Sequence, residues 1–170
     1  LSDLQKKKQI AYIGNDKLQK NLQRIIEAVR NIQYLHPYKL ALIGTGTDKY
    51  KDEFIINYGV LSHSDLIKVT SESEILLFPS LVESFGMPII EGSLLGCKIV
   101  SSKISAIPEI SKQEIIYVDP YNIKSISNGI VKAIQSDYKN INFDIYKPES
   151  IAKDYIDFYY QISSWFQLLL

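Results

Sequence analysis

Short apolar segments alternate along this chain with longer segments of helical periodicity, and this alternation restricts the fold more than any other feature. Strands alternating with helices predict an α/β fold, a doubly wound parallel sheet with helices on both faces. The predicted strands cover 9–13, 39–43, 54–58, 74–78, 98–101 and 115–118. The predicted helices cover 18–34, a segment capped by Ser64 or Asp65 and ending near Ser71, a segment from Pro88, and 122–135 and 150–166.

Bulk composition excludes several classes of protein. The chain has 170 residues, is 46% hydrophobic and carries no formal net charge, which argues against general binding to nucleic acid or membrane. No apolar run approaches the roughly 20 residues of a membrane span. Cys97 is the only cysteine, so an intrachain disulfide is impossible and a cytoplasmic location is expected, either free or at the inner face of the membrane. We expect one domain over 1–170 that ends in a helical tail over 148–170.

One glutamate is predicted to lie on an apolar helical face. Pro88 suits the first position of a helix, where its missing N–H is harmless. Glu91 then closes the first turn, on the same face as Met87 and Leu94. We therefore expect its carboxylate to be partly desolvated and to accept hydrogen bonds from a ligand.

The start of the same helix is predicted to be an anion site. Backbone N–H groups of Phe85, Gly86 and Met87, together with the helix dipole, suit a phosphate. Lys17 and Lys20 follow the first strand and lie at the same carboxyl edge of the sheet, within reach of a diphosphate. The alternative for both lysines is a solvated surface role. The combined pattern indicates a pocket for a phosphorylated ligand rich in hydroxyl groups.

Other motifs carry less information. Gly44-Thr45-Gly46 lacks the third glycine of a dinucleotide fingerprint, so an ordinary turn explains it equally well, and no P-loop occurs. His36 and His63 have no neighbours at metal-ligand spacing, so no metal site is predicted. Ser80 and Ser84 have no nearby histidine, which leaves nucleophilic catalysis unsupported.

Two glutamates separated by seven residues, Glu83 and Glu91, enclose the pair Phe85-Gly86. This pattern resembles the nucleotide-sugar half of retaining glycosyltransferases with the GT-B fold, and most closely glycosyltransferase family 4. The resemblance implies that the chain is the C-terminal, donor-binding domain and that an N-terminal acceptor domain is absent from it. It extends over most of the chain, through Gly14 with Lys20-Asn21, 41–46, 59–62 with Asp65-Leu66, Pro79-Ser80, Gly96, 98–106 and Ile107-Pro108-Glu109.

The resemblance also implies residue roles. Glu91 would accept hydrogen bonds from the ribose hydroxyls of the nucleotide. Glu83 would contact the transferred sugar and Lys20 would neutralise the departing diphosphate, which makes these two the predicted catalytic residues. The other donor-binding residues that it implies are Phe85, Gly86, Met87, Gly14, Asn15, Lys17, Val60, Leu61 and Ser80.

The implied reaction is retaining, metal-independent transfer of a hexosyl group from a nucleotide-diphosphate sugar to an acceptor such as a growing surface polysaccharide of a bacterium. Neither a cofactor nor a metal is implied. The sequence begins at Leu1 rather than methionine, so we expect a piece of a longer protein. The isolated domain is expected to be inactive, and any peripheral membrane association is expected to come through the missing half.

Two positions depart from the family's pattern. Asn15 stands where the family usually has arginine, and the segment 103–106 lacks the usual glycines. Two alternatives therefore stay open. A non-catalytic nucleotide-binding module would bind a nucleotide sugar without turnover, and a sugar-nucleotide epimerase of the same fold would give a different product.

Overall fold

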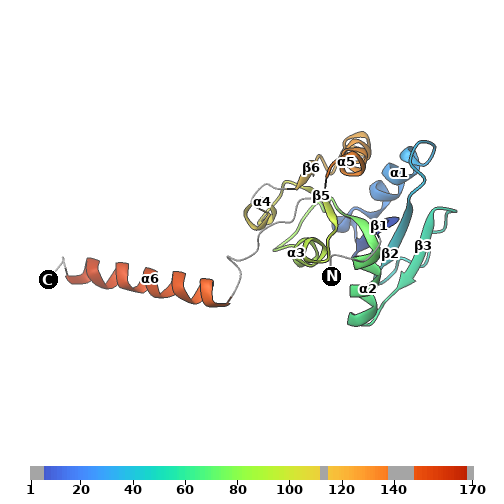
Figure 1. Cartoon of the computed structure of the whole chain (residues 1–170). Coiled ribbons are helices and arrows are strands. Elements are labelled where there is room, and N and C mark those ends of the chain that lie inside the picture. Colours follow the sequence, from blue (N-terminus) through green and yellow to red (C-terminus); the bar gives the residue numbers. More distant parts are fainter. Residues whose placement is uncertain (1–5, 112–114, 138–147, 168–170) are drawn as a thin grey trace.

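The computed structural model describes residues 6–111, 115–137 and 148–167, and the centre of this part of the chain is a six-stranded sheet (Figure 1). All neighbouring strands pair in parallel, in the order β3-β2-β1-β4-β5-β6. The predicted α/β fold with a doubly wound parallel sheet is thus confirmed. The strands are β1 Lys7–Ile13, β2 Lys39–Ile43, β3 Ile55–Gly59, β4 Ser73–Phe78, β5 Lys98–Ser102 and β6 Ile116–Val118.

Helices cover both faces of this sheet. On one face α1 and α5 pack against each other, and α5 also contacts β4, β5 and β6. On the other face α2 contacts β1 and β4, and α3 contacts β4 and β5 (Figure 1). The helices are the 3₁₀ turn η1 Leu18–Lys20, α1 Leu22–Ile32, α2 His63–Glu72, α3 Met87–Leu94, α4 Ile107–Ile110, α5 Ile123–Gln135 and α6 Pro148–Gln167.

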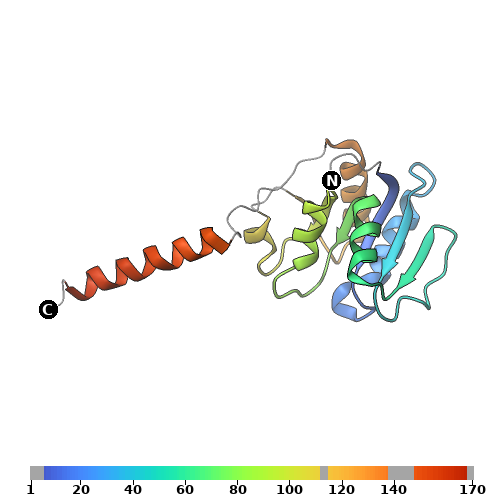
Figure 2. The same ribbon diagram turned by 60° about the horizontal axis from the view of Figure 1, so that its bottom comes forward.

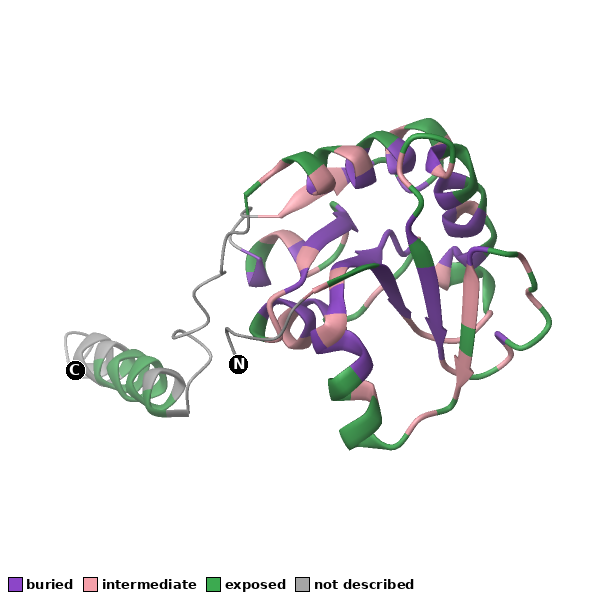
Figure 3. Ribbon diagram, turned by 45° about the vertical axis from the view of Figure 1, so that its right-hand side comes forward, coloured by how far each residue is buried: buried purple, intermediate pink, exposed green. Residues whose placement is uncertain are grey.

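Alternating side chains along the strands build the two layers of the core. In β1, Ile10 and Tyr12 join the cluster beneath α1 and α5, whereas Ala11 joins the cluster beneath α3. In β4, Leu77 joins the cluster beneath α1 and α5, and Leu76 joins the cluster beneath α3. Figure 3 shows the central strands as mostly buried, while the outer faces of the helices are exposed. This burial on both faces explains why the strands are nearly continuous apolar segments.

The predicted first helix begins four residues too early. We expected it to start at Leu18, but the structure has the 3₁₀ turn there and starts α1 at Leu22. Asn21 separates the two, because its backbone is left-handed at φ 61. A left-handed residue interrupts the α-helical hydrogen bonds, and asparagine tolerates this conformation better than most residues.

Two other helix starts also differ from the prediction. Ser62, and not Ser64 or Asp65, caps α2, and its hydroxyl accepts a hydrogen bond from Asp65 N. Pro88 is the second residue of α3, because Gly86 at φ 96 serves as the N-cap and Met87 follows as the first residue. Proline needs no hydrogen-bond partner for its nitrogen anywhere in the first turn, so this one-residue shift costs little.

The tail forms the predicted helix, α6. Figures 1 and 2 both show α6 lying apart from the sheet and the helices that cover it. Its large apolar side chains that the structure describes are exposed: Tyr155, Ile156, Phe158, Tyr159, Tyr160 and Ile162. The assignment of 1–170 to a single domain stays a prediction.

Cys97 lies in the core and is predicted to be unreactive. Its Sγ donates to the carbonyl of Thr70 at 3.1 Å, and burial raises the pKa of the Cys97 thiol to about 11. At pH 8 the thiol is therefore protonated. We expect Ellman's reagent to modify Cys97 more than about 100-fold more slowly in the native chain than in urea. Equal rates in the two conditions would contradict this placement.

Candidate functional site

The strand order creates a switch point between β1 and β4. From β1 the chain continues through β2 and β3 on one side, and then returns to build β4, β5 and β6 on the other. The loops that follow β1 and β4 consequently lead to α1 and α3, which cover opposite faces. In open parallel sheets a crevice forms between such loops, and ligands bind there.

Lys20 and Glu83 meet at this switch point. Lys20 belongs to the loop after β1 and Glu83 to the loop after β4, 63 residues later. The ammonium Nζ of Lys20 lies 2.6 Å from Oε2 of Glu83. The two side chains are 21% and 12% exposed, so the pair is half-buried rather than a mobile surface contact. The structure therefore brings the two predicted catalytic residues into direct contact.

Further contacts hold this pair in place. The Lys20 ammonium also lies 5.2 Å from the ring centre of Phe78, the last residue of β4. Oε1 of Glu83 accepts a hydrogen bond from Ser84 N at 3.1 Å. Leu81 N donates to the carbonyl of Gln19 at 2.8 Å, which ties the two loops together beside the ion pair.

The loop after β1 carries three further predicted residues. Gly14 N donates to the carbonyl of Ile43 at 2.9 Å, and the Asn15 carbonyl accepts from the Tyr12 hydroxyl. Burial raises the pKa of Tyr12 above its usual range, so this hydroxyl stays protonated as a donor. Asn15 Oδ1 accepts from Lys17 N, while the Lys17 side chain is exposed. Asn15 thus serves the turn itself and supplies no charge.

The loop after β4 ends at the N-terminus of α3. Gly86 is the N-cap and is buried, with φ 96, a conformation that favours glycine. Phe85 is 39% exposed and Met87 51% exposed. The first turn of any helix leaves N–H groups without intrahelical acceptors, so this end of α3 retains the geometry expected for an anion.

The apolar face of α3 that carries Glu91 is open to solvent. Met87 and Leu94, on its side of α3, are 51% and 59% exposed, so this apolar face is open to solvent, while Glu91 itself is of intermediate burial. The buried face of α3 consists instead of Ile89, Gly92 and Ser93. Among the residues that the structure describes, the Glu91 carboxylate has no hydrogen-bond or ion-pair partner, so it is available to a ligand.

The remaining predicted residues lie less close to this pair. Ser80 follows β4 but is buried, and its carbonyl accepts from Ser102 Oγ at 2.6 Å. Val60 and Leu61 follow β3, at the same carboxyl edge but two strands away from β1. Val60 is 76% exposed, whereas Leu61 packs against the buried cluster beneath α2.

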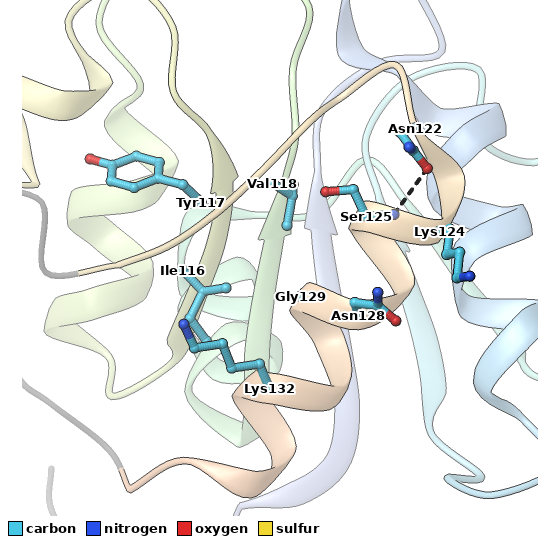
Figure 4. A pocket seen from close by; sticks show the side chains of 9 residues that line it. All are labelled: Ile116, Tyr117, Val118, Asn122, Lys124, Ser125, Asn128, Gly129 and Lys132. Carbon is cyan, nitrogen blue, oxygen red and sulfur yellow. Dashed lines mark hydrogen bonds between the residues drawn. The ribbon is translucent and has the colours of Figure 1, made fainter.

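One cavity lies away from this pair, and no cluster of metal-binding side chains occurs in the described part of the chain. Figure 4 shows a cavity of about 360 Å³ between β6 and α5, lined by residues that include Tyr117, Lys124 and Lys132. Neither Lys20 nor Glu83 lines this cavity. Among residues 6–111, 115–137 and 148–167, no three His, Cys, Asp or Glu side chains gather closely enough to hold a metal ion. The prediction of a metal-independent site stays a prediction.

Two contributors to the site were missed from the sequence. From the sequence, Phe78 is expected only as the last residue of a buried strand. In the structure its ring also faces the Lys20 ammonium. From the sequence, Asn21 is expected inside a helix. In the structure it ends the 3₁₀ turn that carries Lys20. An asparagine directly before an amphipathic segment is a common signal of a left-handed or capping residue, and it would have placed the break correctly.

The fold and the charged pair at its switch point define a Rossmann-like α/β protein. A family model described as "Glycosyl transferases group 1" matches residues 2–149. The chain belongs to this family of glycosyltransferases.

Two curated relatives illustrate the relationship. An uncharacterised glycosyltransferase of Methanocaldococcus jannaschii is 27% identical over 174 aligned residues, which cover 89% of this chain and 44% of the relative. The O-antigen chain mannosyltransferase B of Escherichia coli is 25% identical, over 74% of this chain and 36% of the relative. The chain thus spans less than half the length of either relative.

Solved structures show the same fold. The C-terminal domain of a glycosyl transferase group 1 family protein from Francisella tularensis has a TM-score of 0.65 and 23% identity, over 79% of each chain. Sucrose-phosphate synthase from Thermosynechococcus elongatus has a TM-score of 0.69 and 17% identity, over 96% of this chain and 47% of that one. A structure described as "Trehalose-6-phosphate from E. coli bound with UDP-2-fluoro glucose" has a TM-score of 0.65 and 13% identity, over 80% of this chain and 37% of that one.

No helix in the described part of the chain combines the length and the apolarity that crossing a bilayer requires.

Proposed function

We propose that this chain is the C-terminal, donor-binding domain of a retaining glycosyltransferase of family 4 type. It binds a nucleotide-diphosphate sugar at the carboxyl edge of the sheet, between the loops after β1 and β4. A second domain of the same protein supplies the acceptor, and the isolated domain transfers no sugar. The cytoplasm is the proposed compartment, in keeping with a single cysteine that is a buried thiol.

The observation that carries this proposal is the contact between Lys20 and Glu83. A cation and a carboxylate from two distant loops meet at 2.6 Å, at the switch point where such sheets bind ligands. Glu91 lies on the helix that follows the Glu83 loop and has no partner in the described part of the chain. A diphosphate beside Lys20 and the N-terminus of α3 would place the ribose within the range of Glu91 and the sugar near Glu83.

The proposed chemistry depends on charge that develops as the sugar leaves. Breaking the bond between the anomeric carbon and the diphosphate builds negative charge on the phosphate oxygens. The Lys20 ammonium and the N–H groups at the start of α3 stabilise that charge in place before the reaction begins. In the proposed retaining mechanism the leaving phosphate accepts the proton of the acceptor hydroxyl, so no separate protein base is needed.

The relatives support the donor and acceptor classes. One curated relative is named as an O-antigen chain mannosyltransferase, which favours hexosyl transfer to a growing surface polysaccharide. One solved structure of the same fold is described as bound with UDP-2-fluoro glucose, which favours a nucleotide sugar as the donor. Each of these proteins is longer than this chain, in keeping with a second domain.

Asn15 favours a second candidate, a non-catalytic nucleotide-binding module. Its side chain serves the local turn, and no guanidinium stands at this position to share the diphosphate charge with Lys20. The assembled protein would then bind a nucleotide sugar without turning it over. Membership of a transferase family favours the catalytic proposal over this candidate and over an epimerase.

A ligand screen tests the proposed function. We expect one or two of UDP, GDP, ADP and CDP to raise the unfolding temperature of the 170-residue chain, because a ligand that binds only the native state stabilises it. Binding is expected to be weak, since one wall of the cleft is missing. No shift with any of the four nucleotides at millimolar concentration, confirmed by calorimetry, would overturn the proposal.

Glu91→Ala is expected to weaken binding of the nucleoside diphosphate found in that screen. Losing charge-assisted hydrogen bonds to the ribose costs about 1–3 kcal/mol, measured by calorimetry. Glu53→Ala is the matched control, because Glu53 is an exposed glutamate before β3 and should leave the affinity unchanged. Because the Glu91 carboxylate has no partner to lose in the described part of the chain, both variants should unfold near the temperature of the unmodified chain. An unchanged affinity in Glu91→Ala would show that Glu91 does not bind the ribose.

A further inference from the structure

Asn21 has an unusual place in the described structure. It stands between η1 and α1 with φ 61 and ψ 24, and its side chain is 3% exposed. Asn21 and Ser105 are the only non-glycine residues in the described ranges with positive φ. A left-handed residue costs free energy unless local contacts compensate for it, so the contacts of this side chain indicate its purpose.

The Asn21 amide uses its full hydrogen-bonding capacity as a donor. Nδ2 donates to the carbonyl of Pro79 at 2.9 Å and to the carbonyl of Pro120 at 2.7 Å. Oδ1 accepts from Nη1 of Arg24 at 3.0 Å, which orients the amide with its two N–H groups toward the carbonyls. Arg24 is in turn held near the Tyr121 ring, 5.8 Å from its centre. A buried, fully satisfied amide of this kind is well ordered.

These bonds join three loops at one edge of the sheet. Pro79 directly follows β4, Pro120 follows β6 by two residues, and Asn21 itself ends the loop after β1. The Asn21 side chain therefore hydrogen-bonds the end of the Lys20 loop to the residues that follow β4 and β6. The hydrogen bond from Leu81 N to the Gln19 carbonyl adds a second tie on the other side of Lys20.

We infer that Asn21 is a positioning residue of the donor site, which fixes the direction in which Lys20 presents its charge to a diphosphate. This inference rests on the proposed function. Lys20 is the residue directly before Asn21, and from this backbone position its ammonium reaches Glu83 and Phe78. A lysine on an untethered loop would have to be ordered on binding, which costs affinity.

A double-mutant cycle tests whether Asn21 acts through Lys20. Asn21→Gly removes the amide but keeps the left-handed backbone accessible. We expect Lys20→Ala and Asn21→Gly each to weaken binding of inorganic pyrophosphate by the 170-residue chain about tenfold, measured by NMR titration. The double variant should also be only about tenfold weaker, because Asn21 has nothing to position once Lys20 is gone. A loss of about 100-fold in the double variant would mean independent effects and would overturn the inference.

A matched control separates positioning from general stability. Asn57 in β3 makes a similar set of bonds, donating to the carbonyls of Thr47 and Tyr50 and accepting from the Thr47 hydroxyl. We expect both Asn57→Ala and Asn21→Gly to lower the unfolding temperature. Asn57→Ala should leave the affinity for pyrophosphate unchanged. Equal losses of affinity in the two variants would make Asn21 an ordinary structural residue.

A second variant covers the case in which Asn21→Gly fails to fold. Arg24→Met removes the donor that orients the Asn21 amide, and it should weaken pyrophosphate binding about threefold, but only when Lys20 is present. The same loss in the Lys20→Ala background would overturn the inference. If the unmodified chain binds neither pyrophosphate nor any of the four nucleoside diphosphates, the proposed function fails as well. If it binds them and Asn21→Gly binds equally well, only the role of Asn21 is lost.

Discussion

In the proposed full-length transferase, replacing Lys20 with methionine should lower kcat by about 10²- to 10³-fold. Removing one preorganised charge or donor from the place where negative charge develops typically has this effect. Methionine preserves most of the unbranched apolar stem against Phe78 and removes only the ammonium. Steady-state kinetics with the nucleotide sugar identified by the ligand screen measure the change.

Two variants make that result specific. Lys49→Met removes another lysine of a loop ion pair, with Asp16 as its partner, and should leave kcat within about twofold because exposed pairs contribute little. Glu83→Gln should lower kcat strongly while nucleoside diphosphate affinity is kept, because it removes the sugar contact and leaves Lys20 in place. A full rate in Lys20→Met, or equal losses in Lys20→Met and Lys49→Met, would remove Lys20 from the catalytic residues.

Replacing Gly44 with alanine should destabilise the fold severely. Gly44 has φ 137, and a Cβ there would lie 1.8 Å from the carbonyl oxygen of Gly14, which is backbone and cannot rotate away. The loops after β1 and β2 would have to separate. We expect a loss of more than about 3 kcal/mol in the free energy of unfolding, which lowers the unfolding temperature by roughly 6–12 °C.

Gly59→Ala is the matched control for that prediction. Gly59 has φ 61, but a Cβ there would meet nothing within 4 Å. Only the conformational cost of about 1–2 kcal/mol remains. Urea denaturation of both variants separates the two costs. If Gly44→Ala is no less stable than Gly59→Ala, the close approach of the two loops is wrong.

The sequence predicts the fold closely where burial decides it. The strand 39–43 and the helix ending at Gln135 match β2 and α5, because apolar periodicity reports which faces are buried. One error arises where hydrogen bonds to distant residues decide the backbone conformation. The helix start at Leu18 is wrong because the Asn21 amide bonds to Pro79 and Pro120, which are 58 and 99 residues away.

The candidate site shows the same division. Lys17, Lys20 and the start of α3 could be chosen from the sequence because they follow predicted strands, whereas the role of Glu83 is implied only by the family resemblance. The 2.6 Å contact between Lys20 and Glu83 could not, since it depends on β1 and β4 being neighbours in the sheet. The surroundings of Glu91 depend on tertiary packing in the same way. An apolar face of α3 is covered only if another element packs on it, and in the described part of the chain Met87 and Leu94 are exposed.

The most direct test of the central claim is to map the nucleotide onto the chain. Backbone amide shifts of the 170-residue chain, followed by NMR during titration with the bound nucleoside diphosphate, report which residues meet it. We expect the largest changes in 14–21 and 83–91, on either side of the switch point, and their loss in Lys20→Ala. Changes centred instead on the cavity between β6 and α5 in Figure 4 would contradict the assignment of the donor site.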